Sequence, residues 1–459
     1  MVTNIFLRNR CSLSYIRYHI TVNIMRKNKY LIEKGISPGV YLCYNAFNNS
    51  FLFLNERKQR LLAQNDYNLL FNEDPSFYEH LKKNEFIVDD NLNEYDIIQD
   101  TKRRLQYNSS LCHVMVNTTL DCNLDCWYCY ETKKVNSKLS KEVIEGINKY
   151  IQLEYEKSRY NILKVSFFGG EPFVDFYGVK QILDSAQLFT EKKNIQLIAD
   201  FTTNATLITP EIISYLSNFY CIFQITLDGN RIVHNKIKKD KSKPDWDTYQ
   251  ATIDVLRLIE KHIQKRYVAV RINFSNATLK KIDEIITDIN FLNRKFTYVI
   301  LKKVWQISAD RVDKKLLFNA INKLFDKNFL VDYYIMPKGS VCFAERNREV
   351  LVNYDGKVFK CSTISEFNDL NSLATFNLET GEITWDKNKK AEWFKDITQE
   401  MCKHCKWYPV CLGPCNRQLI AHKGKDICTF DAMNMNTTEY LLYSYRYHKL
   451  KNELAKERD

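Results

Sequence analysis

Residues 121–130 read Asp121-Cys-Asn-Leu-Asp-Cys-Trp-Tyr-Cys-Tyr130 and place Cys122, Cys126 and Cys129 at C-x3-C-x2-C spacing. A cubane [4Fe–4S] cluster takes four thiolates, one for each iron. This loop offers three, and the next cysteine in the sequence is Cys221. If the loop binds a cubane, one iron is left open for another ligand. The alternative is a zinc site whose fourth ligand comes from elsewhere in the chain.

Strands and helices alternate from residue 111 to about residue 305. Strand patterns occupy 112–116, 164–168, 196–201, 222–227, 268–273 and 296–301. Amphipathic helical patterns lie between them, near 140–156, 177–191, 209–217, 247–262 and 278–290. Six βα units in series predict a parallel sheet, either open or curled into a partial barrel. In such sheets, ligands bind at the carboxyl ends of the strands.

The cysteine loop follows the first strand of this series, and polar residues follow the next three. The second strand ends in Gly169-Gly-Glu-Pro172, the third in Thr202-Thr-Asn204 and the fourth in Asp228-Gly229. Glycines without Cβ atoms let the backbone approach a ligand closely, although a plain strand-to-helix turn would also contain them. Asp228 is either a ribose or substrate acceptor or a turn cap. Together, the four strand ends predict one binding site.

A second group of cysteines lies near the C-terminus. It consists of Cys342, Cys361, Cys402, Cys405, Cys411, Cys415 and Cys428. Seven soft ligands within about 90 residues exceed what one zinc ion uses, although C-x2-C pairs also occur in zinc ribbons. The sequence therefore predicts more than one metal centre, with a treble-clef zinc site as the alternative.

The N-terminal region predicts a compact module. Strand patterns at 40–44, 51–54 and 85–89 alternate with helical patterns at 55–64 and 75–84. The charged stretch 89–104 is interpreted as a linker. The first 26 residues are expected to be disordered or loosely attached, and Met25 is an alternative start of the chain.

Composition narrows the class of protein. The chain has 459 residues and a net charge of +12, and no stretch reaches 18 consecutive apolar residues, so a membrane helix is not expected. Ten of the 14 cysteines fall into the two groups, which favours metal binding in a reducing cytoplasm over disulfides. The charge is compatible with nucleic acid, anionic cofactors, an acidic peptide or a lysine-rich surface. No arginine-rich block or basic-aromatic stripe is present, which argues against nucleic acid.

The central region resembles the radical S-adenosylmethionine (SAM) enzymes. The resemblance rests on the C-x3-C-x2-C loop, the Gly-Gly-Glu-Pro run and the βα repeats. It implies a partial (β/α)6 barrel and a [4Fe–4S] cluster whose open iron binds SAM. It also implies cleavage of SAM to a 5′-deoxyadenosyl radical, which abstracts hydrogen from an unactivated C–H bond.

The resemblance assigns roles residue by residue. Cys122, Cys126 and Cys129 would bind the cluster, and Tyr128 would stack near the adenine. Gly169, Gly170 and Glu171 would hold the methionine amino group, and Thr226 with Asp228 would lie near the ribose. Lys238 stands where relatives often have an arginine near the SAM carboxylate. Lysine keeps the charge but lacks the bidentate geometry of arginine.

The second cysteine group is similar to the SPASM extension of radical SAM enzymes, which carries two auxiliary [4Fe–4S] clusters. By this resemblance, one cluster takes Cys402, Cys405, Cys411 and Cys428. The other takes Cys342, Cys361 and Cys415 and lacks a fourth cysteine, which implies a non-cysteine ligand or an open iron. Sulfatase maturases of this class place an aspartate base after the second of these three cysteines. Here that position is Ser362, whose hydroxyl is a poor proton acceptor at neutral pH.

The expected domains are a tail (1–26), a winged-helix-like module and linker (27–104), a radical SAM core (105–310), a SPASM region (311–440) and a basic C-terminal helix (441–459). The module resembles elements that capture the leader of ribosomally made peptides by strand addition, although a plain packing domain is the alternative. We therefore expect a cytoplasmic peptide maturase that takes a precursor peptide and electrons from a flavodoxin- or ferredoxin-like donor. The alternatives are a radical SAM enzyme acting on another protein, RNA or a metabolite, and a non-catalytic iron–sulfur protein.

Overall fold

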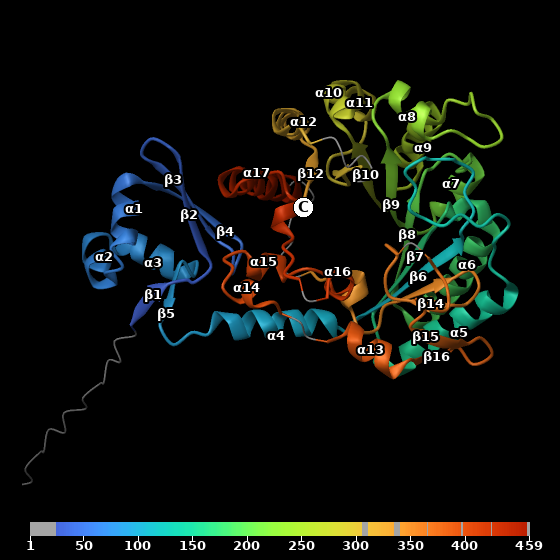
Figure 1. The fold of residues 1–459 in the computed structure, drawn as a ribbon, viewed down its shortest axis with the longest axis horizontal. Coiled ribbons are helices and arrows are strands. Elements are labelled where there is room, and N and C mark those ends of the chain that lie inside the picture. Colours follow the sequence, from blue (N-terminus) through green and yellow to red (C-terminus); the bar gives the residue numbers. More distant parts are fainter. Residues whose placement is uncertain are drawn as a thin grey trace, which may run out of the picture.

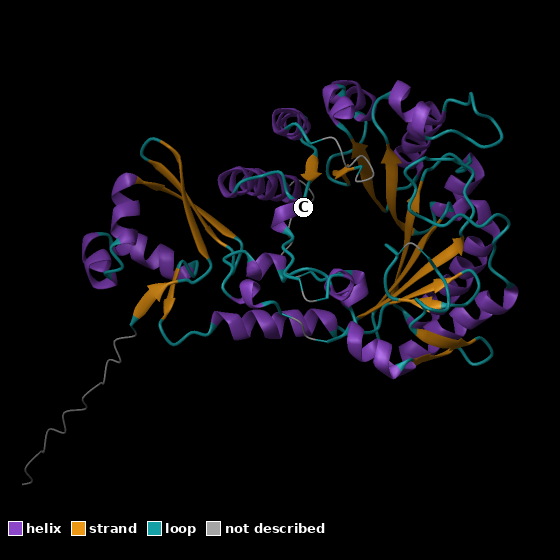
Figure 2. Ribbon diagram, in the orientation of Figure 1, coloured by secondary structure: helices purple, strands orange, loops and turns teal. Residues whose placement is uncertain are grey.

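The computed structural model describes residues 24–304, 311–334, 340–364, 366–395, 398–423 and 425–456. A large α/β part and a small module of strands and helices lie at opposite sides of the molecule (Figures 1 and 2). Helices α4 (Glu94–Gln106) and α17 (Thr437–Lys456) lie between them. Among the described helices, none is both long enough and apolar enough to cross a membrane.

Six parallel strands form the centre of an 11-stranded sheet, and each pairs with the next along the chain. They are β6 (Leu111–Thr119), β7 (Ile162–Gly169), β8 (Gln196–Thr203), β9 (Tyr220–Leu227), β10 (Arg266–Phe274) and β11 (Thr297–Lys303). The predicted α/β fold with a parallel sheet is confirmed.

Helices cover the outer face of this sheet (Figure 1). The predicted ones are α5 (Lys141–Ser158), α6 (Phe176–Lys193), α7 (Pro210–Leu216), α9 (Thr248–His262) and α11 (Ile282–Ile289). The short elements η1 (Pro172–Asp175), α8 (Arg231–Ile237) and α10 (Asn276–Lys280) were not expected. Side chains cap the amino-terminal ends of several of these helices. For example, the Ser140 side chain accepts a hydrogen bond from the Val143 amide at the start of α5.

Side chains alternate between the two faces of the central strands. On β6, Val114 and Val116 are fully buried in the main hydrophobic core beneath the helices. The neighbouring His113 points to the concave side instead, where it forms hydrogen bonds with Ser166 and Glu349 at 2.7 and 3.1 Å. The convex face of the sheet is therefore apolar, whereas the concave face carries polar side chains such as His113 and Ser166 beside apolar ones such as Met115.

Strands from the C-terminal half extend the same sheet at both ends. At one end, β12 (Leu330–Asp332) pairs with β11, and at the other, β13 (Val350–Asn353) pairs in parallel with β6. The antiparallel strands β14 (Val358–Phe359), β15 (Ala374–Asn377) and β16 (Glu382–Trp385) follow β13. The structure thus differs from the expected boundary at residues 310 and 311, because the C-terminal region completes the sheet of the core.

Short helices and loops make up the rest of the C-terminal region before α17. They are α12 (Lys314–Asp326), η2 (Phe343–Glu345), α13 (Lys387–Trp393), α14 (Glu400–Lys403), α15 (Tyr408–Cys411), α16 (Asn416–Ala421) and η3 (Phe430–Ala432). Hydrogen bonds between distant segments hold them, as where Trp393 donates to the Ala344 carbonyl at 2.7 Å. The predicted C-terminal helix is α17, which begins at Thr437.

The N-terminal module has two small sheets and three helices. Strands β2 (Leu31–Ser37), β3 (Val40–Asn45) and β4 (Ser50–Asn55) form one sheet, and β1 (Met25–Lys27) pairs with β5 (Ile87–Asp89). The helices are α1 (Glu56–Ala63), α2 (Tyr67–Glu73) and α3 (Pro75–Lys83). One face of the larger sheet packs on these helices through Leu54, Leu62 and Leu81.

Two details of the N-terminal expectations need correction. The stretch interpreted as a linker contains the 13-residue helix α4, whose Gln99 donates to the Tyr408 hydroxyl at 2.9 Å. Met25 and Arg26, expected in the loose tail, belong to β1, and Arg26 forms an ion pair with the fully buried Glu94 at 2.7 Å. Residues 1–23 of the expected tail lie outside the described residues.

Helix α17 joins the module to the barrel sheet. The Tyr443 hydroxyl donates to the Val331 carbonyl of β12 at 2.7 Å. At the module, the Tyr445 ring lies 5.6 Å from the Phe51 ring and 4.9 Å from the Phe53 ring. C-terminal residues therefore cover part of the second face of the β2–β3–β4 sheet, where Phe53 stays 44% exposed.

Candidate functional site

The cysteine loop follows β6 and is fixed to the segment that follows α8. The Asp125 amide donates to the Lys239 carbonyl at 2.8 Å, and the Lys241 amide donates to the Asn123 carbonyl at 2.9 Å. The Asn123 side chain donates to Asp240 at 3.1 Å. Because these bonds join residues more than 100 positions apart, the tertiary fold determines the shape of the loop.

The three cysteines of the loop lie near one another, with Cys122 and Cys126 half-buried and Cys129 exposed. Burial raises the pKa of Cys122 to about 12 and also raises the pKa of Cys126. The Cys126 thiol is near enough to Cys122 to add to the shift, and Cys129 acts on Cys126 in the same way. Lys238 opposes these shifts at both buried thiols, so a cation is already present where thiolates would form.

The donor set of this loop suits a cluster that takes one further ligand from outside the loop. A cubane spreads its thiolates over separate irons, so its ligands do not meet at one point. The loop, with three thiols and a neighbouring cation, therefore fits a [4Fe–4S] cluster.

The glycine pair after β7 lies directly against the start of the cysteine loop. A Cβ atom on Gly169, whose φ is +109°, would lie 2.1 Å from the Thr119 carbonyl oxygen. A Cβ atom on Gly170 would lie 2.0 Å from the Asp121 carbonyl oxygen. The glycines thus allow close approach, as expected, but what approaches them here is the backbone before Cys122.

Glu171 joins the ends of β7 and β8. Its carboxylate accepts hydrogen bonds from the Thr203 hydroxyl at 2.7 Å and from the Asn204 amide at 2.8 Å. The residue is 1% exposed, and burial raises its pKa. Asn204 in turn donates to the Cys122 sulfur at 3.8 Å. Glu171 therefore lies beside the cysteine loop and orders the next strand end.

Asp228, Tyr128 and Lys238 meet at the end of β9. The Tyr128 hydroxyl donates to Asp228 Oδ2 at 2.5 Å, and Lys238 Nζ lies 3.7 Å from the same oxygen. The other oxygen, Oδ1, is buried and has no hydrogen-bond partner among the described residues. Burial alone would lower the pKa of Lys238, but Asp228 and the nearby cysteines outweigh it and raise the pKa. A buried acceptor thus remains for a ligand hydroxyl.

Thr226 and Asn273 complete this part of the site on β9 and β10. Thr226 is half-buried on the concave face, two residues before Asp228. Asn273 donates to the Tyr128 hydroxyl at 2.9 Å. Sequence reasoning did not assign roles to Asn123 or Asn273. The position of Asn273 at the end of a strand pattern could have marked it as a site residue. The position of Asn123 within the cysteine motif could have done the same.

The C-terminal cysteines fall into two groups in the structure. Burial, together with the nearby thiols of Cys411, Cys405 and Cys428, raises the pKa of Cys402 to about 11. Burial raises the pKa of Cys342 to about 11, and Cys361 and Cys415 are near enough to contribute. The structure therefore brings together one set of four cysteines and one set of three.

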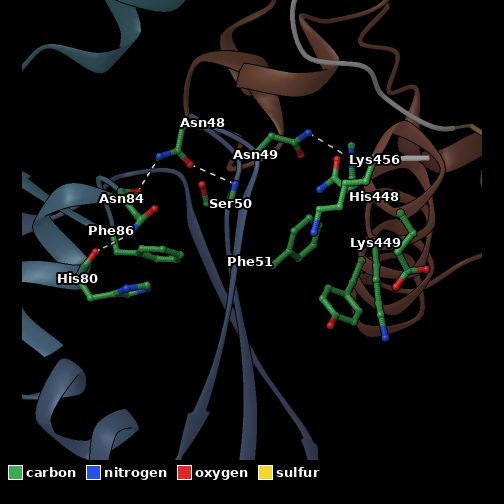
Figure 3. A pocket seen from close by; sticks show the side chains of 13 residues that line it. Asn48, Asn49, Ser50, Phe51, His80, Asn84, Phe86, His448, Lys449 and Lys456 are labelled. Atoms are coloured by element: carbon green, nitrogen blue, oxygen red, sulfur yellow. Dashed lines mark hydrogen bonds between the residues drawn. The ribbon is translucent and has the colours of Figure 1, made fainter. Parts of the chain in front are cut away.

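A separate cavity of 610 Å³ lies between the N-terminal module and α17 (Figure 3). Asn48 donates to the Asn84 carbonyl at 2.6 Å on one side, and Asn49 and His448 are 3.2 Å apart on the other. Basic side chains of α17, including Lys449 and Lys456, line the cavity together with Glu453. The cavity borders the first residues of β4, an edge strand of its sheet.

Comparison with known proteins gives the class of the enzyme. Residues 116–289 match the model of the radical SAM superfamily. An uncharacterized protein of Methanocaldococcus jannaschii is 27% identical, covering 57% of this chain and 88% of that protein. The cysteine-type anaerobic sulfatase-maturating enzyme of Clostridium perfringens is 24% identical, covering 64% and 86%. The radical SAM cyclopropyl synthase TigE of Paramaledivibacter caminithermalis is 23% identical, covering 58% and 59%.

Among solved structures, native anSMEcpe with bound AdoMet and Cp18Cys peptide matches with a TM-score of 0.51 and 18% identity. The match covers 76% of this chain and 97% of that one, and it concerns the fold alone. Together, the family match, the parallel sheet and the cysteine loop identify a radical SAM domain in this chain. The chain contains a radical SAM domain and is related to a cysteine-type anaerobic sulfatase-maturating enzyme and to a radical SAM cyclopropyl synthase. This family implies a [4Fe–4S] cluster and SAM.

Proposed function

We propose that this chain is a radical SAM/SPASM peptide maturase, which abstracts hydrogen from a ribosomally made precursor peptide and forms a cross-link, thioether or related bond. The observation that carries the proposal is the cavity beside β4, which the N-terminal module shares with α17. Helix α17 also contacts β12 of the barrel sheet. A peptide bound in the cavity would therefore contact a helix that is fixed to the same sheet as the cysteine loop.

The edge of β4 suits strand addition by a leader peptide. Among the described strands, β4 pairs on one side only, with β3. An extended peptide could pair with its other side through main-chain hydrogen bonds. The lysines across the cavity favour a leader that carries acidic residues. This part of the proposal assigns residues 27–104 to peptide capture.

Substrates of the relatives support a peptide as the substrate class. The anSMEcpe structure contains a bound peptide, and TigE is a cyclopropyl synthase. Sulfatase maturation is the second candidate, favoured by the Clostridium perfringens relative. Ser362 argues against it, because a serine hydroxyl without an activating partner cannot serve as the base at neutral pH.

The cysteine loop is proposed to hold the catalytic cluster, which when bound and reduced cleaves SAM to supply the 5′-deoxyadenosyl radical. Cys122, Cys126 and Cys129 would bind it. Glu171 would accept from the methionine amino group, and the unpartnered Oδ1 of Asp228 would accept from a ribose hydroxyl. Lys238 would neutralise part of the negative charge beside the thiolates.

The C-terminal cysteines are proposed to hold two auxiliary [4Fe–4S] clusters. Cys402, Cys405, Cys411 and Cys428 would ligate one fully. Cys342, Cys361 and Cys415 would ligate three irons of the other, and its fourth iron would take a non-cysteine ligand or substrate. A flavodoxin- or ferredoxin-like protein would supply electrons to the catalytic cluster.

The test is incubation of the anaerobically reconstituted enzyme with SAM, a reductant and the small peptide encoded beside its gene. We expect a peptide product that has lost two hydrogen atoms, together with 5′-deoxyadenosine. The matched control is the same peptide without its leader, which should be modified much more slowly. Unchanged peptide in the presence of rapid 5′-deoxyadenosine formation would contradict the proposed substrate class.

A further inference from the structure

The concave face of the barrel sheet carries basic side chains in two different settings. Lys164 on β7 forms an ion pair with Asp200 at 2.7 Å. Arg271 on β10 and Lys302 on β11 are half-buried on the same face, and in the described part of the chain neither forms an ion pair with a carboxylate. The Asp332 carboxylate acts on Lys302 from beyond ion-pair distance, so the two half-buried cations are only partly compensated until a ligand supplies a further anion.

Arg271 and Lys302 lie close together. Their strands are neighbours, and Lys302 pairs in register with Asn273, two residues beyond Arg271. Lys302 Nζ lies 4.9 Å from the centre of the Tyr334 ring. Burial lowers the pKa of Lys302, and the positive charge of Arg271 lowers it as well. The carboxylate of Asp332 acts in the opposite direction and only partly offsets these two effects. The two positive charges are thus near enough to share one anion.

A chain of hydrogen bonds connects this pair to the proposed SAM site. Arg271 donates through Nε to Asn273 Oδ1 at 3.0 Å, and Asn273 donates to the Tyr128 hydroxyl at 2.9 Å. Tyr128 then donates to Asp228 at 2.5 Å. With its Nε engaged by Asn273, Arg271 still has its terminal guanidinium nitrogens for another acceptor. An anion bound to the guanidinium group of Arg271 would lie inside the barrel, below the residues assigned to SAM.

We propose that Arg271 and Lys302 form a carboxylate-binding site for the substrate, so that the peptide segment entering the barrel carries an Asp or Glu side chain beside the residue to be modified. This inference rests on the proposed peptide-modifying function. Guanidinium and ammonium groups bind carboxylates through charge-assisted hydrogen bonds, and a site inside the barrel excludes water that would weaken them. The site would fix the register of the peptide relative to SAM.

The SAM carboxylate is the competing occupant, and the structure favours the substrate. Lys238 already provides a buried cation between Asp228 and the cysteine loop. Arg271 and Lys302 lie one and two strands beyond β9, and Arg271 is connected to the Tyr128 hydroxyl of the loop only through Asn273. The two occupants make different predictions for labelling in the presence of SAM alone.

The test measures acetylation of Lys302 by N-hydroxysuccinimidyl acetate in the full-length holoenzyme, read by mass spectrometry. Lys303, on the opposite face of β11, is the internal reference. The probe is N-acetyl-glutamate N-methylamide, and its glutamine counterpart is the control. With SAM present, we expect the glutamate probe to slow labelling of Lys302 by at least about fivefold, the glutamine probe to have no effect, and Arg271→Gln to abolish protection.

Equal protection by the two probes, or protection by neither, would overturn the proposal. Blocking of Lys302 by SAM alone would also overturn it, because the pair would then hold the cofactor. If Arg271→Gln does not fold, calorimetry decides instead: Lys302→Gln should lose binding of the glutamate probe, and Lys303→Gln should keep it. Since neither readout needs turnover, failure of peptide modification would refute the proposed function and leave this result standing.

Discussion

Gly170 lies against the peptide group of Asp121, the residue immediately before the first cysteine of the loop. The carbonyl oxygen of Asp121 accepts a hydrogen bond from the Glu171 amide at 2.9 Å, so the two backbones are held face to face. A side chain at this position would separate them. The end of β7 therefore controls where the cysteine loop begins.

Gly170→Ala is expected to displace the loop, because its Cβ atom would lie 2.0 Å from the Asp121 carbonyl oxygen. Crowding of this kind costs about 1–3 kcal/mol of stability. We expect a lower midpoint of thermal unfolding and about four fewer irons per chain after reconstitution. Gly35→Ala is the matched control, since its Cβ atom would meet nothing closer than 3.7 Å. Full iron loading of Gly170→Ala would contradict this role.

The residues that the sequence could predict are those whose type is unusual at a strand end. Cysteines at fixed spacing, a glycine pair and an aspartate after apolar strands all stand out in the sequence. Asn123 and Asn273 could not be assigned in this way, because their partners Asp240 and Tyr128 lie more than 100 residues away. An asparagine acquires such a role only once the strands are in register.

At the scale of elements, the six central strands were predictable because each is a short apolar run between amphipathic helices. Strands β12 and β13, which flank the six on either side, were missed, since a run of three or four residues carries little periodic signal. Helix α4 was interpreted as a linker because its exposed face is highly charged. Its few buried contacts, including Ile98, pack on distant segments that the sequence does not connect.

The contact between α17 and β4 predicts a dependence of stability on pH. Burial lowers the pKa of His448 to about 4, while its ring contacts Asn49 at 3.2 Å. The unfolded chain binds this proton near pH 6.5, so stability is complete above that pH and is lost as pH falls toward 4. We expect a loss of about 1 kcal/mol per pH unit, less than the full slope because the ring is partly exposed. Chemical denaturation of the wild type and His448→Gln would measure it, and equal slopes would contradict it.

Charge reversal on α17 tests the proposed leader site. Lys449 lines the cavity beside β4, whereas Lys451 on the same helix does not. Lys449→Glu should weaken binding of an acidic leader by about 1 kcal/mol or more, roughly five- to tenfold in Kd. Lys451→Glu should leave the Kd nearly unchanged in the same fluorescence titration. Equal effects of the two variants would indicate only long-range attraction by net charge.

At the scale of the whole molecule, both halves of the chain contribute strands to one sheet. The C-terminal region supplies β12 and β13 to the two edges of the barrel sheet and then returns to the N-terminal module through α17. The segments proposed for peptide capture, for radical formation and for the auxiliary clusters are thereby joined in one body. The sequence indicated these parts as consecutive domains and could not reveal that they share a sheet.

Three clusters predict about 12 irons per chain after anaerobic reconstitution. Cys405→Ser should lower this number by up to about four and leave 5′-deoxyadenosine formation without peptide largely intact, because that residue belongs to the set of four near α14 and α15. Metal analysis of both proteins measures the effect. About four irons together with bound zinc in the wild type would contradict the proposal of two auxiliary clusters.

The central claim is that the loop from Cys122 to Cys129 holds the cluster that cleaves SAM, and Cys126→Ala tests it most directly. The measurement is reductant-dependent formation of 5′-deoxyadenosine by the reconstituted variant. Cys112→Ala is the control, since it removes a buried thiol from β6 on the face that packs against the helices. We predict no 5′-deoxyadenosine from Cys126→Ala and near-normal amounts from Cys112→Ala. Undiminished formation by Cys126→Ala would contradict the account.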